Sequence, residues 1–480
     1  MSDIQPLLIH GKWVRDTGAT LAPVNPATGA PNRTVAAATP EVVAEAVRSA
    51  ATAAADPAWH GLLPHRRGRL LARLADVVAS RAEAFAQAQM AENGKPRSEC
   101  QAQVAAAEAI YRYYAAVCET VSAEMTPPRG NYLSMSSHEP YGVVAAITPW
   151  NSPLTMEAQK VAAALAAGNA VILKPSEVTP SCALLLGRAA LDAGLPAGVL
   201  NVLPGTGAQA GEALVRHPGV KMVSFTGGTE SGRRIARAAA DKLMPVALEL
   251  GGKSPHIVFA DADLDAAAAS VAGGIFEGSG QSCVAGSRLF VQRACHQPVV
   301  DRVLARARSL VLGRPEESAT QMGPLASFAH RERIERFVDG ARAEGGEVLA
   351  GGGRPGADAL RHGAYYEPTV IGGLPNTAAA CQQEIFGPVL CVLPFDDEDD
   401  LVAQANDSAF GLAAGIWTGD YRRAWRVAQR LQAGTVWINT YKQLSISTPF
   451  GGFKDSGVGR EKGVSGMRLY QQQKSIYWGL

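Results

Sequence analysis

Short apolar runs alternate with helical segments in the middle of the chain, and this alternation gives the first structural prediction. The apolar runs lie at 142–147, 170–173, 199–203, 220–225 and 246–250. Segments with helical periodicity separate them, near 157–167, 181–193, 208–217 and 231–242. Apolar runs joined by helices are typical of a parallel sheet with helices on its faces. The pattern therefore predicts a compact α/β unit of the nucleotide-binding type.

The part of the chain before this unit has a helical pattern and ends in a segment of different character. After a short strand-and-loop entry, alanine and leucine spaced three and four residues apart predict helices at about 40–54, 66–93 and 98–120. Between residues 123 and 140 this period is lost, because 126–130 contain two prolines and a glycine and an alternating pattern follows at 132–136. The segment 123–140 is predicted to form an exposed hairpin arm outside the core.

A second α/β pattern begins after Ser254. An apolar run at 255–259 and an alanine-rich helical segment at about 264–276 open it, and the alternation continues to Asn439. Five consecutive carboxylates lie within this part, at 396–400. They precede a helical segment, whose N-terminal end is positive, so we interpret them as residues of a helix start and not as a metal site.

Composition and charge exclude several classes of protein. The chain has 480 residues, 47% of them hydrophobic, and a formal net charge of +1. This length predicts more than one core, and the near-neutral charge gives no footprint for nucleic acid. The start of the chain lacks a basic segment followed by a long apolar one, and no apolar stretch is long enough to span a membrane. We expect a cytoplasmic protein that binds neither nucleic acid nor membrane.

The cysteines are scattered, and one of them has an unusual setting. There are 7, without CxxC spacing, which argues against a disulfide framework and against structural zinc, and no metal site is expected. Cys283 lies in a stretch of glycines and small polar residues, 280–288, between the helical segment 264–276 and an apolar run at 289–291. This context suits a thiol presented at the end of an element as a nucleophile, which needs a cation, a helix N-terminus or a base nearby. A cysteine packed as a small hydrophobe is the alternative.

Several motifs occur in a fixed order along the chain. Leu248-Glu249-Leu250-Gly251-Gly252-Lys253-Ser254-Pro255 precedes Gly280-Gln281-Ser282-Cys283. Further motifs lie at 25–29, 148–151, 173–177, 225–229, 384–388 and 449–457. With these motifs the chain resembles the NAD(P)-dependent aldehyde dehydrogenase superfamily, of the non-acylating type, over nearly its whole length.

The resemblance implies an α/β fold with a Rossmann-type parallel-sheet cofactor domain, a second α/β catalytic domain and a β-arm for oligomerisation. Residues 1–122 and 141–250 would form the NAD(P)-binding domain and 251–440 the catalytic domain. Residues 123–140 and 441–480 would supply the oligomerisation arm, the substrate loop and the C-terminal tail. A homodimer or a homotetramer is expected, because both appendages would be partly apolar on a monomer.

The resemblance also implies roles for three catalytic residues. Cys283 would attack the aldehyde and form a thiohemiacetal, whose oxyanion the Asn151 side chain and the Cys283 backbone N–H would stabilise. Hydride transfer to the cofactor would leave a thioester. Glu249, inside an apolar run, would be the general base for the water that hydrolyses it.

The implied cofactor is NAD, with NADP as the alternative. No GxGxxG motif follows the first strand of the unit, and the string around Gly207 is a weak substitute. The acidic Glu177 would bind the adenosine ribose and repel a 2′-phosphate, which favours NAD. Many family members have serine where this chain has Gly228. The implied cofactor residues are Thr148, Pro149, Trp150, Lys174, Pro175, Ser176, Glu177, Gly207, Phe225, Thr226, Gly227, Gly228, Leu250, Glu384 and Phe386.

The implied substrate is a small aldehyde, and its identity stays open. The residues expected to contact it are Asn151, Ser282, Val284, Tyr111 and Lys442. Lys442 or Arg112 would meet the carboxylate if the substrate is a semialdehyde. Two alternatives remain at this point. The first is a CoA-acylating enzyme, in which a thiol replaces water and no base is needed, and the second is a catalytically silent structural protein with the same fold.

Overall fold

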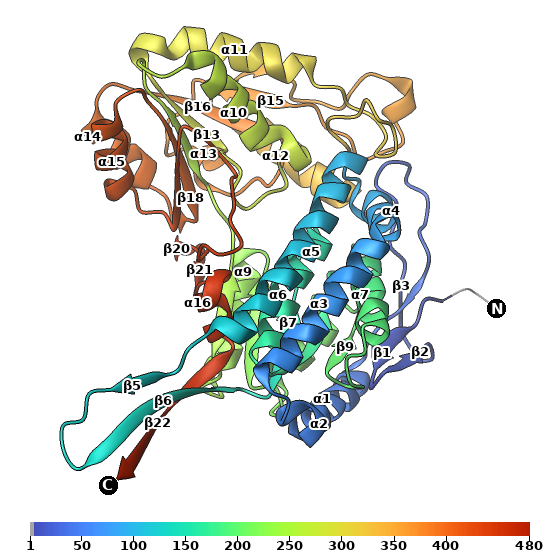
Figure 1. Ribbon diagram of the computed structural model, residues 1–480. Coiled ribbons are helices and arrows are strands. Elements are labelled where there is room, and N and C mark those ends of the chain that lie inside the picture. Colours follow the sequence, from blue (N-terminus) through green and yellow to red (C-terminus); the bar gives the residue numbers. More distant parts are fainter. Residues whose placement is uncertain (1–3) are drawn as a thin grey trace.

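The computed structural model describes residues 4–480 and contains two α/β bodies and an extended arm (Figure 1). Residues 1–3, at the start of the chain, lie outside the described residues. The first body is built on an eight-stranded sheet and the second on a seven-stranded sheet. In the described part of the chain, none of the helices has the length and apolarity needed to cross a membrane. The α/β fold class predicted from the sequence is confirmed.

The first sheet has the strand order β2-β1-β9-β8-β7-β10-β11-β21. Its central strands run parallel and match the apolar runs of the sequence: β9 (Leu200–Val202), β8 (Ala170–Lys174), β7 (Val143–Ile147), β10 (Met222–Thr226) and β11 (Val246–Glu249). The antiparallel edges are β1 (Leu7–Ile9), β2 (Lys12–Val14) and β21 (Gly457–Val458). Since β7 precedes both of its neighbours in the chain, the strand order reverses beside it. In open parallel sheets such a point marks the ligand crevice, outside the carboxyl ends of the strands.

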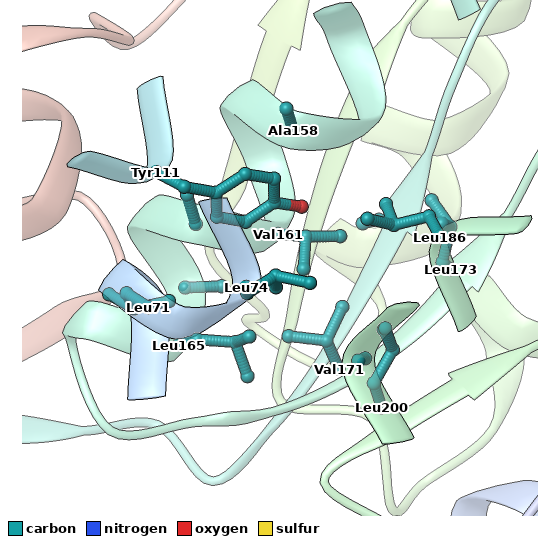
Figure 2. Packing of buried hydrophobic residues seen from close by; sticks show 14 of the residues in the cluster. Leu71, Leu74, Tyr111, Ala158, Val161, Leu165, Val171, Leu173, Leu186 and Leu200 are labelled. Atoms are coloured by element: carbon teal, nitrogen blue, oxygen red, sulfur yellow. The ribbon is translucent and has the colours of Figure 1, made fainter. Parts of the chain in front are cut away.

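Helices cover both faces of this sheet. On one face lie α3 (Pro64–Ser80), α5 (Arg97–Thr120), α6 (Pro153–Ala166) and α7 (Ser181–Asp192). Figure 2 shows Leu74, Val161 and Leu186 of these helices packed against Val171 and Leu173 of β8. The other face carries α1 (Pro40–Ala55), α8 (Glu212–Arg216) and α9 (Thr229–Ala240). The alternation of strand side chains between two buried clusters explains why the apolar runs are continuous.

The helix predicted over 66–93 is two helices in the structure. α3 ends at Ser80, and α4 (Ala82–Asn93) begins after Arg81, whose φ of −111° and ψ of 21° interrupt the helix. The Arg81 guanidinium pairs with Asp192 at the end of α7. Apolar spacing continues through the break, so periodicity alone did not reveal it. The segment expected near 208–217 likewise divides into a π-helical turn, η1 (Gly207–Gly211), and α8.

The second sheet has the order β14-β15-β16-β13-β12-β18-β19. Its strands are β14 (Glu347–Ala350), β15 (Thr369–Gly372), β16 (Val389–Phe395), β13 (Arg288–Gln292), β12 (Pro255–Val258), β18 (Ala413–Trp417) and β19 (Thr435–Ile438). The surrounding helices are α10 (Leu264–Phe276), α11 (His296–Ser309), α12 (Phe328–Ala343), α13 (Ala379–Gln382), α14 (Glu398–Asn406) and α15 (Tyr421–Arg430). The acidic run begins α14, where Asp397 accepts hydrogen bonds from the N–H groups of Asp399 and Asp400. Its interpretation as a helix start is confirmed.

The arm is a three-stranded antiparallel ribbon that projects from the first body (Figure 1). It contains β5 (Glu124–Thr126), β6 (Tyr132–Pro140) and β22 (Gln471–Gly479). The predicted hairpin is therefore present, and the tail adds a third strand to it. Between the second body and the arm, the chain forms β20 (Phe453–Lys454), β21 and α16 (Gly463–Arg468). β21 extends the first sheet, so the last part of the chain connects both bodies.

Candidate active site

The carboxyl ends of the central parallel strands open onto a cavity of about 580 Å³. Trp150 and Asn151 follow β7, Gly227 follows β10 and Leu250 follows β11, and all four line this cavity. Cys283, from the loop that precedes β13 of the second body, lines it as well. The cavity thus lies where the topology of the first sheet predicts a ligand site, and the second body provides its other wall.

Cys283 is held by a loop that depends on close backbone contacts. Of the seven cysteines it is the only one that is partly exposed, and the other six are buried. After α10 the chain turns through Ser279 and Gly280, with φ values of 56° and 70°. A side-chain carbon on Gly252 would lie 2.3 Å from the Cys283 carbonyl oxygen, and one on Gly280 would lie 2.1 Å from that of Gly387. Glycine at both positions lets the loop pack against its neighbours and fixes the position of the thiol.

The surroundings of Cys283 keep its thiol protonated. Burial raises the pKa of this thiol to about 12, and the carboxyl groups of Glu384 and Glu249 add to the rise, while Lys462 opposes it. The thiolate is the nucleophilic form. The thiol must therefore give its proton to a base or to solvent before it can attack a substrate.

Asn151 is attached to the Cys283 loop by a hydrogen bond. Its Nδ2 donates to the Gln281 carbonyl oxygen at 2.9 Å, two residues before the thiol. The Gln281 side chain is fixed in turn, because its Oε1 accepts from the Ala326 N–H at 2.8 Å. An asparagine amide carries two N–H groups, so one remains to donate to an oxygen atom that develops charge beside Cys283.

Glu249 is a buried carboxyl group at the end of β11. It is 5% exposed, and its Oε2 has no hydrogen-bond partner among the described residues. Burial raises the pKa of Glu249 well above its usual range, and Glu461 adds to the rise, whereas Lys160, Arg460 and Lys462 oppose it. A carboxyl group with a raised pKa in a cavity has the basicity that a general base needs near neutral pH.

Behind Glu249 lies a buried polar network that the sequence analysis missed. Lys160 pairs with Glu461 and donates to Ser224 Oγ at 2.9 Å. Ser224 donates to Glu461 at 3.0 Å and accepts from the Tyr470 hydroxyl at 2.9 Å. The signal that could have revealed it is Lys160 itself, a lysine in the alanine-rich, apolar α6. Its partner Glu461 lies 301 residues further along the chain, so no local sequence pattern could predict the pair.

Most of the predicted cofactor residues lie together, and some lie apart. Eight of them line the cavity: Pro149, Trp150, Thr226, Gly227, Gly228, Leu250, Glu384 and Phe386. Thr148 is buried directly before this group, and its N–H donates to the Lys174 carbonyl oxygen at 3.1 Å. The group Lys174, Pro175, Ser176 and Glu177 follows β8 outside the cavity lining, with the Lys174 ammonium 3.5 Å from the Glu177 carboxylate.

The remaining two predicted cofactor residues have other surroundings. The Phe225 side chain belongs to the core of the first body, and its ring covers Gly227, where a side-chain carbon would lie 2.5 Å from it. Gly207 begins the π-helical turn η1 and also lies outside the cavity lining. The structure does not bring these two side-chain positions together with Cys283.

The cofactor side of the cavity has features that suit a dinucleotide. The hydroxyl groups of Thr148 and Thr226 are buried without partners among the described residues. α9 begins after Gly228 without a side-chain cap, so its first N–H groups are free to meet a phosphate. Glu384 accepts from the Gly252 N–H at 2.9 Å, and burial raises the pKa of Glu384 to about 7. These groups could hold phosphate oxygens and sugar hydroxyls.

Among the predicted substrate residues, Asn151, Ser282, Val284 and Lys442 line the cavity, and Tyr111 does not. Tyr111 is completely buried in the core of the first body, and Figure 2 shows it beside Ala158 and Val161 of α6. Its expected place in the substrate tunnel is therefore corrected, because α5 turns this residue toward α6. Arg112 is also elsewhere, on the surface, where it pairs with Asp76 and Glu108.

The cavity contains other polar side chains that the sequence analysis did not identify. They include Gln103, Gln159, His330, Glu461 and Lys462. His330 is neutral in this environment, because burial lowers its pKa to about 4. In the part of the chain that the structure describes, no group of three or more His, Cys, Asp or Glu side chains could hold a metal ion. The site is thus organised around a thiol, an amide and a carboxyl group.

Comparison with known proteins gives a consistent result. A model described as the aldehyde dehydrogenase family matches residues 13–476. The NAD+ complex of an aldehyde dehydrogenase from Bacillus cereus is 39% identical, with 100% of this chain and 97% of that chain covered and a TM-score of 0.97. Betaine aldehyde dehydrogenase from Staphylococcus aureus in complex with NAD+ is 36% identical, with 99% of this chain and 94% of that chain covered and a TM-score of 0.97.

Proposed function

The chain belongs to the aldehyde dehydrogenase family, and we propose that it oxidises an aldehyde to the carboxylic acid with NAD through a thioester of Cys283 that water hydrolyses. The observation that carries this proposal is the meeting of Cys283, Asn151 and Glu249 in one cavity. Similar structures that hold NAD+ support the choice of cofactor.

The first step uses Cys283 and Asn151. After losing its proton to solvent or to Glu249, the Cys283 sulfur attacks the aldehyde carbon, and a C–S bond forms while the carbonyl oxygen becomes an oxyanion. The free Asn151 N–H and the Cys283 backbone N–H would donate to this oxyanion. Such preorganised donors are typically worth about 3–4 kcal/mol each in the transition state.

The middle of the reaction depends on the cofactor and on the residues that would hold it. NAD, when bound, supplies the acceptor for the hydride of the tetrahedral carbon. Gly227 and Gly228 at the start of α9 would meet its pyrophosphate, and Lys174 and Glu177 its adenosine ribose. Glu384 and Phe386 would position the nicotinamide end. The acyl group then remains on Cys283 as a thioester.

The last step uses Glu249. Its carboxylate takes a proton from a water molecule, the resulting hydroxide attacks the thioester carbon, and the C–S bond breaks to return the Cys283 thiolate and release the acid. A buried carboxyl group with a raised pKa in the cavity is what this step needs. In the CoA-acylating alternative, an external thiol replaces water and Glu249 would have no function.

We further propose that the substrate class includes semialdehydes. Lys442 and Lys462 both line the cavity that contains Cys283, so the cavity offers cations for the carboxylate of such a substrate. The Lys442 ammonium already lies 3.7 Å from the Glu277 carboxylate and donates to the Gly273 carbonyl oxygen at 3.3 Å. Lys442 therefore has partners of its own.

The proposed function predicts NADH formation from aldehydes without CoA. The measurement is the initial rate of nicotinamide reduction for aliphatic, aromatic and carboxylated aldehydes with NAD and with NADP. We expect NAD to be preferred by about tenfold or more, because Glu177 would oppose a 2′-phosphate by charge repulsion. A rate that appears only when CoA is added would contradict the hydrolytic mechanism, and no reduction with any aldehyde would contradict the proposed function.

We also propose a cytoplasmic homodimer or homotetramer assembled through the arm. All seven cysteines are free thiols, which suits a reducing compartment. The arm exposes large apolar side chains, with Tyr477 69% and Trp478 67% exposed, and such surfaces commonly mark protein interfaces. Light scattering of the purified protein measures the assembly, and a monomeric mass at micromolar concentration would contradict this proposal.

A further inference from the structure

Lys462 is a cation in the cavity that makes no ion pair among the described residues, although the charges of Glu461 and Glu249 act on it. Four Lys or Arg side chains line the cavity, and the other three have partners. Lys95 lies 3.0 Å from Glu99, Lys442 lies 3.7 Å from Glu277, and Arg333 donates to the Glu384 carbonyl oxygen at 2.8 Å. Among the described residues, the Lys462 ammonium makes neither a hydrogen bond nor an ion pair, and its Nζ lies 5.0 Å from the centre of the Phe450 ring.

The backbone of Lys462 is strained. Its φ of 60° and ψ of 170° fall in a region that glycine adopts readily and that other residues avoid. Lys462 is the residue directly before α16, and its two neighbours in the chain, Glu461 and Gly463, are buried. Strained residues that are not glycine concentrate at ligand sites, where the strain places a side chain that function requires. The conformation therefore supports a role for the Lys462 ammonium in the cavity.

The charge of Lys462 acts at the reacting centre. Burial raises the pKa values of Cys283 and Glu249, and Lys462 is among the groups that oppose both rises. Lys462 and Cys283 line the same cavity, and the Phe450 ring beside Lys462 belongs to the cluster against which Cys283 packs. An anionic group bound to Lys462 would therefore lie near an aldehyde carbon bonded to Cys283.

The wall of the cavity on α5 and α6 combines polar side chains with the apolar Ala102, Ala106 and Met156. Gln103 donates to Ser152 Oγ at 3.3 Å, and Thr155 donates to the Gln103 carbonyl oxygen at 3.4 Å. The Oε1 atoms of Gln103 and Gln159 are buried without partners among the described residues. Unpaired acceptors of this kind are matched by a hydrogen-bond donor on the substrate and not by its carboxylate, so a cation of the cavity must bind the carboxylate.

We propose that Lys462 binds the carboxylate of the substrate, so that the preferred substrates are short semialdehydes in which a carboxylate and an aldehyde are a few carbons apart. The assignment rests on the proposed function and narrows its substrate class. It gives the carboxylate to Lys462 rather than to Lys442, because Lys442 already forms an ion pair with Glu277. A contact between Lys462 and the carboxylate that the reaction forms would be a different role. Every aldehyde substrate gives such a carboxylate, so that contact would not favour semialdehydes.

The experiment compares succinate semialdehyde with butanal, which has the same carbon chain and no carboxylate. The variants are Lys462→Met, Lys462→Arg and the matched control Lys442→Met, all measured as kcat/KM for NADH formation. The quantity of interest is the ratio of the two kcat/KM values, because a general effect on Cys283 changes both equally and cancels. A charge-assisted hydrogen bond is worth a factor of about 10 to 150, so we expect the ratio to fall by about that factor in Lys462→Met. Lys462→Arg should retain most of the ratio, and Lys442→Met should leave it within about threefold.

Each outcome decides between the proposals. A ratio unchanged in Lys462→Met, or lowered only in Lys442→Met, overturns the assignment of Lys462. A wild-type enzyme that oxidises butanal as well as the semialdehyde also overturns it and leaves the proposed function intact. Failure of the wild type on every aldehyde tested counts against the proposed function itself. Competitive inhibition of aldehyde oxidation by succinate measures the binding of a carboxylate that does not itself react. The inhibition constant of succinate should rise in Lys462→Met by about the same factor as the ratio falls.

Discussion

Replacing Cys283 by alanine is expected to lower kcat/KM for aldehyde oxidation by about 10⁴-fold or more, since loss of a covalent nucleophile removes the whole acylation route. Asn151 and Glu249 cannot compensate, because one stabilises an oxyanion that no longer forms and the other hydrolyses a thioester that is no longer made. The measurement is the initial rate of NADH formation with the best aldehyde of the panel. Cys295→Ala is a matched control, because Cys295 is a buried thiol outside the cavity.

Chemical labelling tests the same assignment without turnover. Cys283 is the one cysteine of the seven that is partly exposed, so iodoacetamide should modify it first under native conditions. Because burial raises the pKa of this thiol to about 12, the rate of labelling should increase with pH across the neutral and mildly alkaline range. Full activity of Cys283→Ala, or loss of activity with another cysteine labelled first, would mean that the chemistry lies elsewhere in the chain.

Local sequence was sufficient to predict the parallel strands of the first sheet and the loop that contains Cys283. The continuous apolar runs predict β7 and β10 because both faces of a parallel sheet are buried. The glycine-rich stretch around Cys283 predicts a thiol presented at the end of an element, and the structure places Cys283 in a loop that lines the cavity. The motifs after β7 and β11 then supply Asn151 and Glu249 at the same edge of the sheet, where the cavity forms.

The parts that the sequence did not predict depend on contacts between distant residues. Which face of α5 packs against α3 and α6 decides that Tyr111 is core and not substrate wall, and apolar periodicity is compatible with either. Lys160 and Glu461 come together only because the C-terminal segment returns to the first body after β21. The same return of the C-terminal segment brings Lys462 to the cavity. Its charge and its strained backbone acquire meaning only when the cavity is known.

Replacing Glu249 by glutamine is expected to separate the two halves of the reaction. The first turnover should survive, because the half-buried Cys283 thiol can give its proton to solvent, and a burst of NADH equal to the concentration of active sites should appear. The steady-state rate should then fall by about 10²–10⁴-fold, the usual contribution of a positioned general base. Stopped-flow measurement of NADH resolves the two phases, and mass spectrometry of the stalled protein should find an acyl group on Cys283.

The pH dependence of the wild type gives a second test of Glu249. Burial raises the pKa of this carboxyl group well above its usual range, so it binds its proton up to a higher pH than an exposed glutamate. The base is the deprotonated form, and the steady-state rate should therefore increase with pH through this raised pKa and decrease as pH falls below it. In Glu249→Gln this limb of the profile should disappear.

Glu157→Gln is the control that distinguishes base catalysis from the general effect of neutralising a buried carboxyl group. Glu157 is also completely buried, with its pKa well above the usual range because of burial and the nearby Glu92, but it lies outside the cavity. This variant should show the steady-state rate of the wild type and no burst. If both variants stall after one turnover, or if Glu249→Gln turns over at the rate of the wild type, water activation by Glu249 is excluded, and the thioester must be resolved in another way.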